Sequence, residues 1–169
     1  MYKTLVRPIL EYGMQIWYPQ FKGDVDRLEK VQRRDIKLVK GFKNYPYEKR
    51  LLLLNLTTLD YRRQRNDMIQ VFQIFKGFDK ISSDVFFTCN SSDRTRGHSY
   101  KLYKSRPATK LRANSFSQRT VNNWNELPEE VVSANTIDSF KGRLGRFWIN
   151  HPTKFSTNLV IIMGTIIFS

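Results

Sequence analysis

The sequence predicts a mostly α fold, a helical bundle of about five to seven helices, because apolar residues recur at helical spacing in most segments. Residues that commonly begin or end helices separate these segments. Only residues 100–103 alternate as a strand does, which allows one small β-hairpin. Hydrophobic residues make up 40% of the 169 residues, enough for a folded core in one domain or in two small lobes.

The first predicted helix covers residues 5–17, and Pro8 either kinks it or lies in its first turn. We interpret the aromatic residues at its end, Trp17, Tyr18 and Phe21, as core rather than as stacking positions for bases, because they have helical spacing. The second helix covers residues 24–41, with Asp24 as N-cap and Gly41 as stop. Its apolar residues share one side, and the opposite side carries an arc of about 140°, interrupted only by Asp26 and formed by Arg27, Lys30, Arg33, Arg34, Lys37 and Lys40.

Two further helices are predicted in the first half of the chain. A short one follows Pro46 and ends at Asn55, and the four leucines 51–54 should bury most of its circumference. Thr58 then caps a helix over residues 59–76 whose opening turns contain Arg62, Arg63 and Arg65. Cations at a helix N-terminus oppose the helix dipole, so bound phosphates would explain them. Exposed arginines without a partner are the alternative.

Residues 77–93 are predicted to form a loop, and no acidic residue occurs from 94 to 125. Basic residues alternate there with tyrosines, a composition that suits a groove for a nucleic-acid backbone with stacking positions. The alternative is a surface hairpin whose tyrosines cover the core. The basic residues of this acid-free block are Arg94, Arg96, Lys101, Lys104, Arg106, Lys110, Arg112 and Arg119.

The last third of the chain predicts two helices and an apolar tail. Ser115 caps a helix over residues 116–126 that Pro128 ends. Asn135 begins the last helix, whose apolar stripe consists of Ile137, Phe140, Leu144, Phe147 and Trp148. Four regions therefore follow one another: helical residues 1–77, the basic loop or hairpin 78–114, helical residues 115–150 and the tail 151–169.

The net charge points to a polyanionic partner. Lys and Arg number 29 against 15 acidic residues, which gives a formal charge of +14. Nucleic acid is the commonest partner of so basic a chain, and anionic membranes and acidic proteins are the alternatives. The apolar part of the tail has about ten residues, half of what a membrane span requires.

We expect no catalysis by this chain alone, no metal site and no cofactor. Paired carboxylates that could share two metal ions are missing, since Asp24 and Asp26 point in different directions on a helix. His98 and His151 have no metal-ligating neighbours at suitable spacing. The single Cys89 and the lack of a signal-peptide pattern predict an intracellular protein, without distinguishing nucleus from cytoplasm.

Six short motifs occur in a characteristic order between Tyr2 and Trp148. Three of them fall in the first half of the chain: residues 5–13 followed by Trp17, residues 28–34 and residues 59–63. The others are residues 94–98, 116–128 and 140–141. In order and spacing they resemble the region after the palm in reverse transcriptases of LINE-type (non-LTR) retrotransposons, the jockey-like elements.

The resemblance implies a thumb and post-thumb region, the helical part that grips template and primer. The family's fingers, its palm with the Tyr-x-Asp-Asp metal site and its endonuclease would lie before Met1, so we expect a truncated fragment without the active site. Residues 151–169 do not resemble the family. A thumb separated from its palm would expose an apolar face, and we expect self-association through residues 5–17.

These arguments predict sequence-independent binding of an RNA–DNA or other duplex backbone, with no small-molecule substrate. The predicted contacts are Arg33, Arg34, Lys37, Lys40, Arg62, Arg63, Arg94, Arg96, Lys101, Lys104 and Arg112. Three alternatives remain open: reverse transcriptase activity as in the full-length relatives, a basic peripheral membrane protein, and a product without a selected function.

Overall fold

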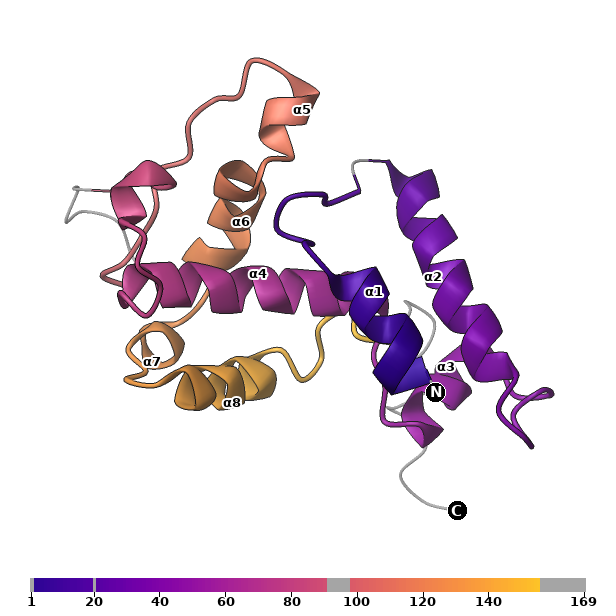
Figure 1. Ribbon diagram of the computed structural model, residues 1–169. Helices are drawn as coiled ribbons and strands as arrows, with labels where there is room; N and C mark the ends of the chain where they lie inside the picture. The colour runs from indigo at the N-terminus through magenta and orange to yellow at the C-terminus, as the bar shows by residue number, and fades with distance from the viewer. Residues whose placement is uncertain (1, 20, 91–97, 156–169) are drawn as a thin grey trace. The chain divides into compact units, whose positions relative to one another are not determined.

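The computed structural model describes residues 2–19, 21–90 and 98–155 (Figure 1). Over these ranges the chain forms eight α-helices, which confirms the mostly α fold. The count exceeds the predicted five to seven because two short helices, α5 and α7, add to the six segments predicted as helices. In chain order the elements are a π-helix Tyr2–Val6, α1 Arg7–Glu11, α2 Lys22–Lys37, α3 Tyr47–Leu53, α4 Leu59–Phe75, a 3₁₀ turn Ser83–Val85, α5 Lys110–Ala113, α6 Phe116–Asn125, α7 Glu129–Val132 and α8 Ile137–Phe147.

The chain divides into two compact units. Unit 1 consists of Met1–Arg63 with Asn150–Ser169, and unit 2 of Gln64–Ile149. The division falls inside helix α4, which is continuous in sequence and structure, and therefore does not coincide with the predicted boundary at residue 77.

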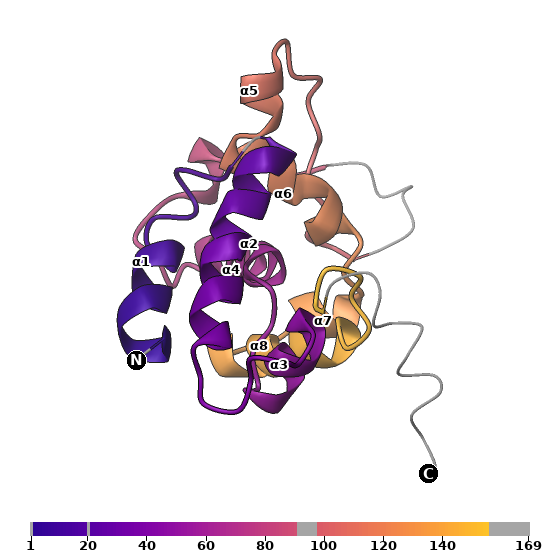
Figure 2. The same ribbon diagram turned by 90° about the vertical axis from the view of Figure 1, so that its right-hand side faces the viewer.

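Unit 1 has a small core between α2 and α3, which lie side by side in both views (Figures 1 and 2). The core consists of Ile36, Tyr47, Leu51 and Leu56. The prediction that the four leucines 51–54 are buried on most sides is wrong, since Leu53 remains 55% exposed. The reason is that only one side of the short helix α3 packs against the rest of the unit.

The ends of the helices in unit 1 follow the predicted signals in part. Helix α2 begins two residues before Asp24, without a side-chain cap, and ends at Lys37. Gly41 lies beyond it in a turn, with a φ of +86° that favours glycine. The predicted cap of α4 is confirmed, because the Thr58 hydroxyl accepts a hydrogen bond from the backbone N–H of Tyr61 at 3.2 Å.

The first helix is shorter than predicted and exposes apolar side chains. Pro8 lies in the first turn of α1, and the helix ends at Glu11. Ile9, Tyr12 and Ile16 are 75%, 82% and 91% exposed. Two of the three aromatic residues interpreted as core are exposed as well, Trp17 to 40% and Phe21 to 66%, so that interpretation is wrong for them. Self-association through the exposed apolar residues stays a prediction.

Residues 151–155, predicted as the start of an unrelated tail, pack in unit 1 beside the beginning of α4. The Thr58 hydroxyl donates a hydrogen bond to the carbonyl of Thr153, and the Thr58 N–H donates one to the carbonyl of Lys154 at 3.2 Å. The rings of Tyr61 and His151 lie 5.7 Å apart. Residues 156–169, with the apolar part of the predicted tail, lie outside the described residues.

Unit 2 has an aromatic core. The ring of Phe72 on α4 stacks on Phe140 of α8 with 4.2 Å between centroids, and Phe75 stacks on Trp124 of α6 at 5.7 Å. Helices α6 and α8 lie on different sides of α4 in both views (Figures 1 and 2). Helix α8 is capped by Thr136 rather than Asn135, and Phe147 is 47% exposed rather than core, because it lies in the last turn.

Among the described residues, the predicted hairpin corresponds to one antiparallel bridge, between Cys89 and Leu102. The N–H of Asn90 donates to the Lys101 carbonyl at 2.8 Å, and the N–H of Tyr103 donates to the Thr88 carbonyl at 2.7 Å. Within the part of the chain that the structure describes, no helix is both long and apolar enough to cross a membrane.

Candidate nucleic-acid interface

The inward side of α2 is held by a network of polar side chains. The Gln32 amide donates hydrogen bonds to the Tyr47 hydroxyl at 2.8 Å and to the carbonyl of Thr57 at 3.0 Å. The Tyr47 hydroxyl donates to the Glu29 carboxylate, whose other oxygen accepts from the N–H of Leu59 at 3.0 Å. This network fixes the rotation of α2 about its axis, so it determines which side chains point outward.

Burial is the main cause of the shifted pKa of Glu29. Desolvation raises the pKa of this carboxyl above its ordinary value, while its hydrogen bonds with Tyr47 and Leu59 and the charge of Arg63 lower it. The neighbouring Arg63 guanidinium has a pKa lowered by the same desolvation. The ionisation of Glu29 and Arg63 is therefore determined by burial and by neighbouring groups of the protein.

The outward side of α2 carries exposed cations. Lys30, Arg34 and Lys37 have neither an ion pair nor a hydrogen-bond partner for their side chains within the described ranges. Arg33 lies with its guanidinium carbon 4.6 Å from the centroid of the Tyr47 ring, a cation–π contact that orders the side chain without neutralising it. Arg27 has only a solvent-exposed pair with Asp24 at 3.3 Å.

These side chains form one basic strip, which we call the α2 face and define as Arg27, Lys30, Arg33, Arg34 and Lys37. At 100° per residue they span an arc of about 120°, and the eleven residues from first to last extend about 15 Å along the helix. Each strand of a duplex carries a phosphate about every 3.4 Å of its axis. The α2 face is therefore long enough to contact more than one phosphate of a strand.

Three lysines beside the α2 face belong to the same unit. Lys40 was predicted to lie in the last helical turn, but it lies past the end of α2 and is exposed. Lys43 and Lys49 are also exposed, and the Lys49 amine lies 4.5 Å from the centroid of the Tyr45 ring. Lys43 and Lys49 were not among the predicted phosphate contacts, although three lysines between residues 40 and 49 were a visible signal in the sequence.

The arginines at the start of α4 do not form a phosphate-binding surface. Arg62 makes a two-point ion pair with the Glu11 carboxylate, one hydrogen bond of which measures 2.9 Å, and Glu11 is also held by Arg7 at 3.1 Å. Arg62 is therefore neutralised within unit 1, which corrects its assignment as a phosphate contact.

Arg63 is the second correction, because it is only 1% exposed and cannot reach a phosphate on the surface. None of its three guanidinium nitrogens has a hydrogen-bond partner among the described residues. The charges that favour its ionised form are those of Asp60, Glu29 and Glu11, together with the nearby Tyr18. Arg63 is thus an interior charge of unit 1.

The acid-free block of unit 2 separates into structural and exposed residues. Arg94 and Arg96 lie outside the described residues. Lys101 is half-buried, and the Lys104 amine donates a hydrogen bond to the side-chain oxygen of Asn122 at 2.9 Å. Arg112 is exposed. Arg119 pairs with the buried Asp67 at 2.9 and 3.0 Å.

The aromatic and apolar residues of this block serve the fold. The carboxamide of Asn125 accepts from the N–H of Leu102 at 2.8 Å and donates to its carbonyl at 2.9 Å. The Trp124 indole donates to the carbonyl of Tyr100 at 2.8 Å. Residues 98–102 are therefore fastened to α6. The Tyr100 ring is half-buried, with the Lys76 amine 4.9 Å from its centroid, whereas Tyr103 is 59% exposed. Stacking of bases in this block stays a prediction.

His98 is buried and hydrogen-bonded to the backbone. His98 is 3% exposed, its Nε2 lies 2.9 Å from the carbonyl of Trp124, and its Nδ1 accepts from the N–H of Tyr100 at 3.2 Å. Burial lowers its pKa, which favours the neutral ring. Over residues 2–19, 21–90 and 98–155, no group of three His, Cys, Asp or Glu side chains is arranged to hold a metal ion.

Comparison of the chain with protein-family models, with curated proteins and with solved structures finds no match. The candidate site therefore rests on the geometry of the α2 face: a helix fixed on its inward side by hydrogen bonds, with cations on its outward side that the described part of the chain leaves largely unneutralised.

Proposed function

We propose that this chain binds the phosphate backbone of an RNA–DNA or other duplex, without sequence specificity, through the α2 face. The observation that carries the proposal is the exposure of Lys30, Arg34 and Lys37 on one side of a single helix, without partners among the described residues. Lysine and arginine recognise phosphates by charge, so this contact fixes position rather than base sequence.

A merely solvated surface explains this arrangement less well. Lys30 lies four residues from Arg34 and Arg33 lies four residues from Lys37, so like charges stand next to each other on the helix surface. Each such pair costs about 0.2–0.5 kcal/mol of helix stability. A bound polyanion removes that repulsion, and it also replaces the counterions that the strip would otherwise attract.

The proposal extends to the kind of protein. The order of the six sequence motifs supports a thumb and post-thumb region similar to that of LINE-type reverse transcriptases, in which the α2 face would position template and primer. In this proposal the chain holds nucleic acid and performs no chemistry itself. A primer-extension assay with magnesium tests this part: we expect no extended product, and extension by the purified chain would contradict it.

The binding test measures fluorescence anisotropy of a labelled RNA–DNA hybrid with the wild-type chain and with the triple variant Lys30→Gln, Arg34→Gln, Lys37→Gln. We expect the affinity of the variant to fall at least about tenfold, equivalent to about 1.4 kcal/mol. A matched control, Lys3→Gln, Lys80→Gln, Arg146→Gln, removes the same charge from exposed positions outside the α2 face. Equal losses in both triple variants would contradict the assignment to α2, and no binding by the wild-type chain would contradict the proposed function.

A further inference from the structure

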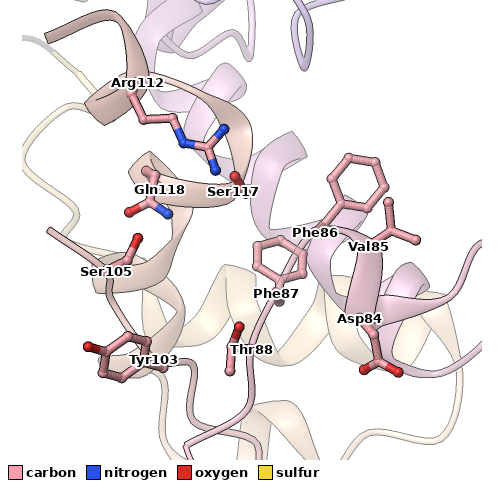
Figure 3. A pocket seen from close by; sticks show the side chains of 10 residues that line it. All are labelled: Asp84, Val85, Phe86, Phe87, Thr88, Tyr103, Ser105, Arg112, Ser117 and Gln118. Atoms are coloured by element: carbon pink, nitrogen blue, oxygen red, sulfur yellow. The ribbon is translucent and has the colours of Figure 1, made fainter. Parts of the chain in front are cut away.

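A pocket of about 410 Å³ lies in unit 2, between the segment around Phe86 and the helices α5 and α6 (Figure 3). This volume is within the range of sites for small molecules. Arg112, Gln118, Ser105 and Tyr103 line one side of the pocket, and Phe86 and Asp84 lie on the opposite side (Figure 3). Apart from Val85 and the two phenylalanines, the lining side chains are polar, which favours a polar ligand over an apolar one.

Gln118 supplies an unused hydrogen-bonding group. The side chain is only 9% exposed, and its carboxamide oxygen has no hydrogen-bond partner among the described residues. A buried polar atom without a partner costs about 1–3 kcal/mol, and a rotation of the carboxamide that let this oxygen accept from a ligand in the pocket would remove that cost. A carboxamide carries a donor and an acceptor side by side, the pattern with which glutamine recognises the edge of a nucleobase.

The aromatic wall is rigid and partly accessible. Phe87 is 5% exposed and packs against Phe75 with 5.6 Å between centroids and against Phe116 at 5.7 Å. Phe86 packs edge to face on Phe116 at 6.1 Å but remains 38% exposed. A ring held in this way loses little freedom when a base stacks on it, and such stacking contributes about 1–3 kcal/mol per base.

The charge at the pocket rim completes the pattern. Arg112 is exposed, and its guanidinium has no ion pair in the part of the chain that the structure describes. In Figure 3 it lies at the opposite end of the pocket from Asp84, so the two charges do not neutralise each other. A phosphate group would find its counter-charge at the Arg112 end, with the hydroxyl of Ser117 nearby.

We propose that this pocket binds a single unpaired nucleotide, with the base against Phe86 and the carboxamide of Gln118 and the phosphate at Arg112. The proposal goes beyond backbone binding by α2 and does not depend on it, because every residue of the pocket belongs to unit 2. It adds recognition of a base to a chain whose proposed contacts are otherwise to phosphates alone.

The test titrates each of the four nucleoside 5′-monophosphates into the ¹⁵N-labelled full-length chain and follows the NMR signals of the Gln118 side-chain amide. We expect saturable shifts of these signals. The variant Gln118→Met, which keeps the length of the side chain, should weaken binding about tenfold, since a two-point base contact contributes about 1–3 kcal/mol. Arg112→Gln should weaken binding of the monophosphates but not of the corresponding nucleosides.

Two outcomes would overturn the proposal. One is the absence of a saturable shift in the wild-type chain. The other is equal binding of ribose 5-phosphate or inorganic phosphate, which would show that no base is recognised. Lys110→Gln is the matched control, because Lys110 is an exposed cation of α5 that does not line the pocket. Loss of α2-dependent duplex binding leaves this titration unchanged, so the two proposals fail separately.

Discussion

The α2 face and the opening turns of α4 are both rich in basic residues, but the cations of α2 are exposed, whereas those of α4 are paired or buried. On α2, Lys30, Arg34 and Lys37 are exposed without partners in the described ranges. On α4, Arg62 is paired with Glu11, and Arg63 is buried. On these two helices, cations stay exposed and unpaired among the described residues where the tertiary structure brings no acidic residue to them, and they are paired or buried elsewhere.

Acidic residues far apart in sequence produce this difference. Glu11 lies 51 residues before its partner Arg62, and Asp67 lies 52 residues before its partner Arg119. Both pairs depend on contacts between helices, whereas the α2 face needs only its own helical period and an inward side that packs. The following predictions test this contrast, beginning with the largest expected effect on stability.

The strongest dependence on a partner is predicted for Asp67 on α4, whose side chain is 6% exposed beside Arg119. Asp67→Ala leaves the charge of Arg119 uncompensated in a largely buried position and should lower the free energy of unfolding by about 3–5 kcal/mol. Urea unfolding followed by fluorescence measures the change. The double variant Asp67→Leu, Arg119→Leu should recover part of the loss, and equal loss in both would show that side-chain volume matters more than charge.

A smaller effect is predicted for the pair of Glu11 and Arg62, which is 15% and 21% exposed. Glu11→Gln keeps the shape of the side chain and removes its charge, so unfolding should become easier by about 1–3 kcal/mol. Asp26→Asn is the matched control, because Asp26 is exposed on α2. The control should leave stability unchanged and strengthen duplex binding, since it removes the one acid within the basic arc; weaker binding would argue against the α2 face.

The buried Glu29 on the inward side of α2 should make the free energy of unfolding depend on pH. Because burial raises the folded-state pKa of Glu29, the folded chain binds this proton more readily than the unfolded chain. The contribution of Glu29 to stability should therefore increase as the pH is lowered toward the unfolded value of 4.5 and be lost as the pH rises through the folded pKa. Unfolding free energies of the wild-type chain and of Glu29→Gln, compared from about pH 7 to about pH 5, measure this. A difference that does not change with pH would contradict the cause given for the shift.

The smallest effect on stability is predicted for the α2 face itself. The triple variant Lys30→Gln, Arg34→Gln, Lys37→Gln should stabilise the chain by no more than about 1 kcal/mol, because it removes two pairs of like charges that cost about 0.2–0.5 kcal/mol each. Thermal unfolding followed by circular dichroism measures the change. A large destabilisation would mean that these cations serve the fold, and the contrast with α4 would then disappear.

Much of the fold follows from local signals in the sequence. The cap at Thr58 and the stop after α3 at Asn55 depend on neighbouring residues alone, and the structure has both. The outward side of α2 also follows from its period. The length of the first helix was overestimated, and Trp17 and Phe21 were wrongly assigned to the core, because helical spacing alone does not show whether other segments pack against a residue.

The rest of the site depends on contacts that no local pattern contains. The pairing of Arg62 required knowledge that Glu11 is near it. For Arg63 a signal did exist: on a helical wheel it lies about 40° from Leu59, which is fully buried. The pocket around Gln118 gave no signal, since its walls come from segments that only the tertiary structure brings together.

The measurement that tests the central claim most directly is the salt dependence of binding to an RNA–DNA hybrid between about 50 and 200 mM salt, for the wild-type chain and for the Lys30→Gln, Arg34→Gln, Lys37→Gln variant. The slope of log affinity against log salt concentration changes by about 0.9 for each phosphate contact with a duplex. The account predicts that the variant loses about 2.7 units of slope and that the control at Lys3, Lys80 and Arg146 retains the wild-type slope. An unchanged slope in the α2 variant would contradict the claim that these side chains contact phosphates.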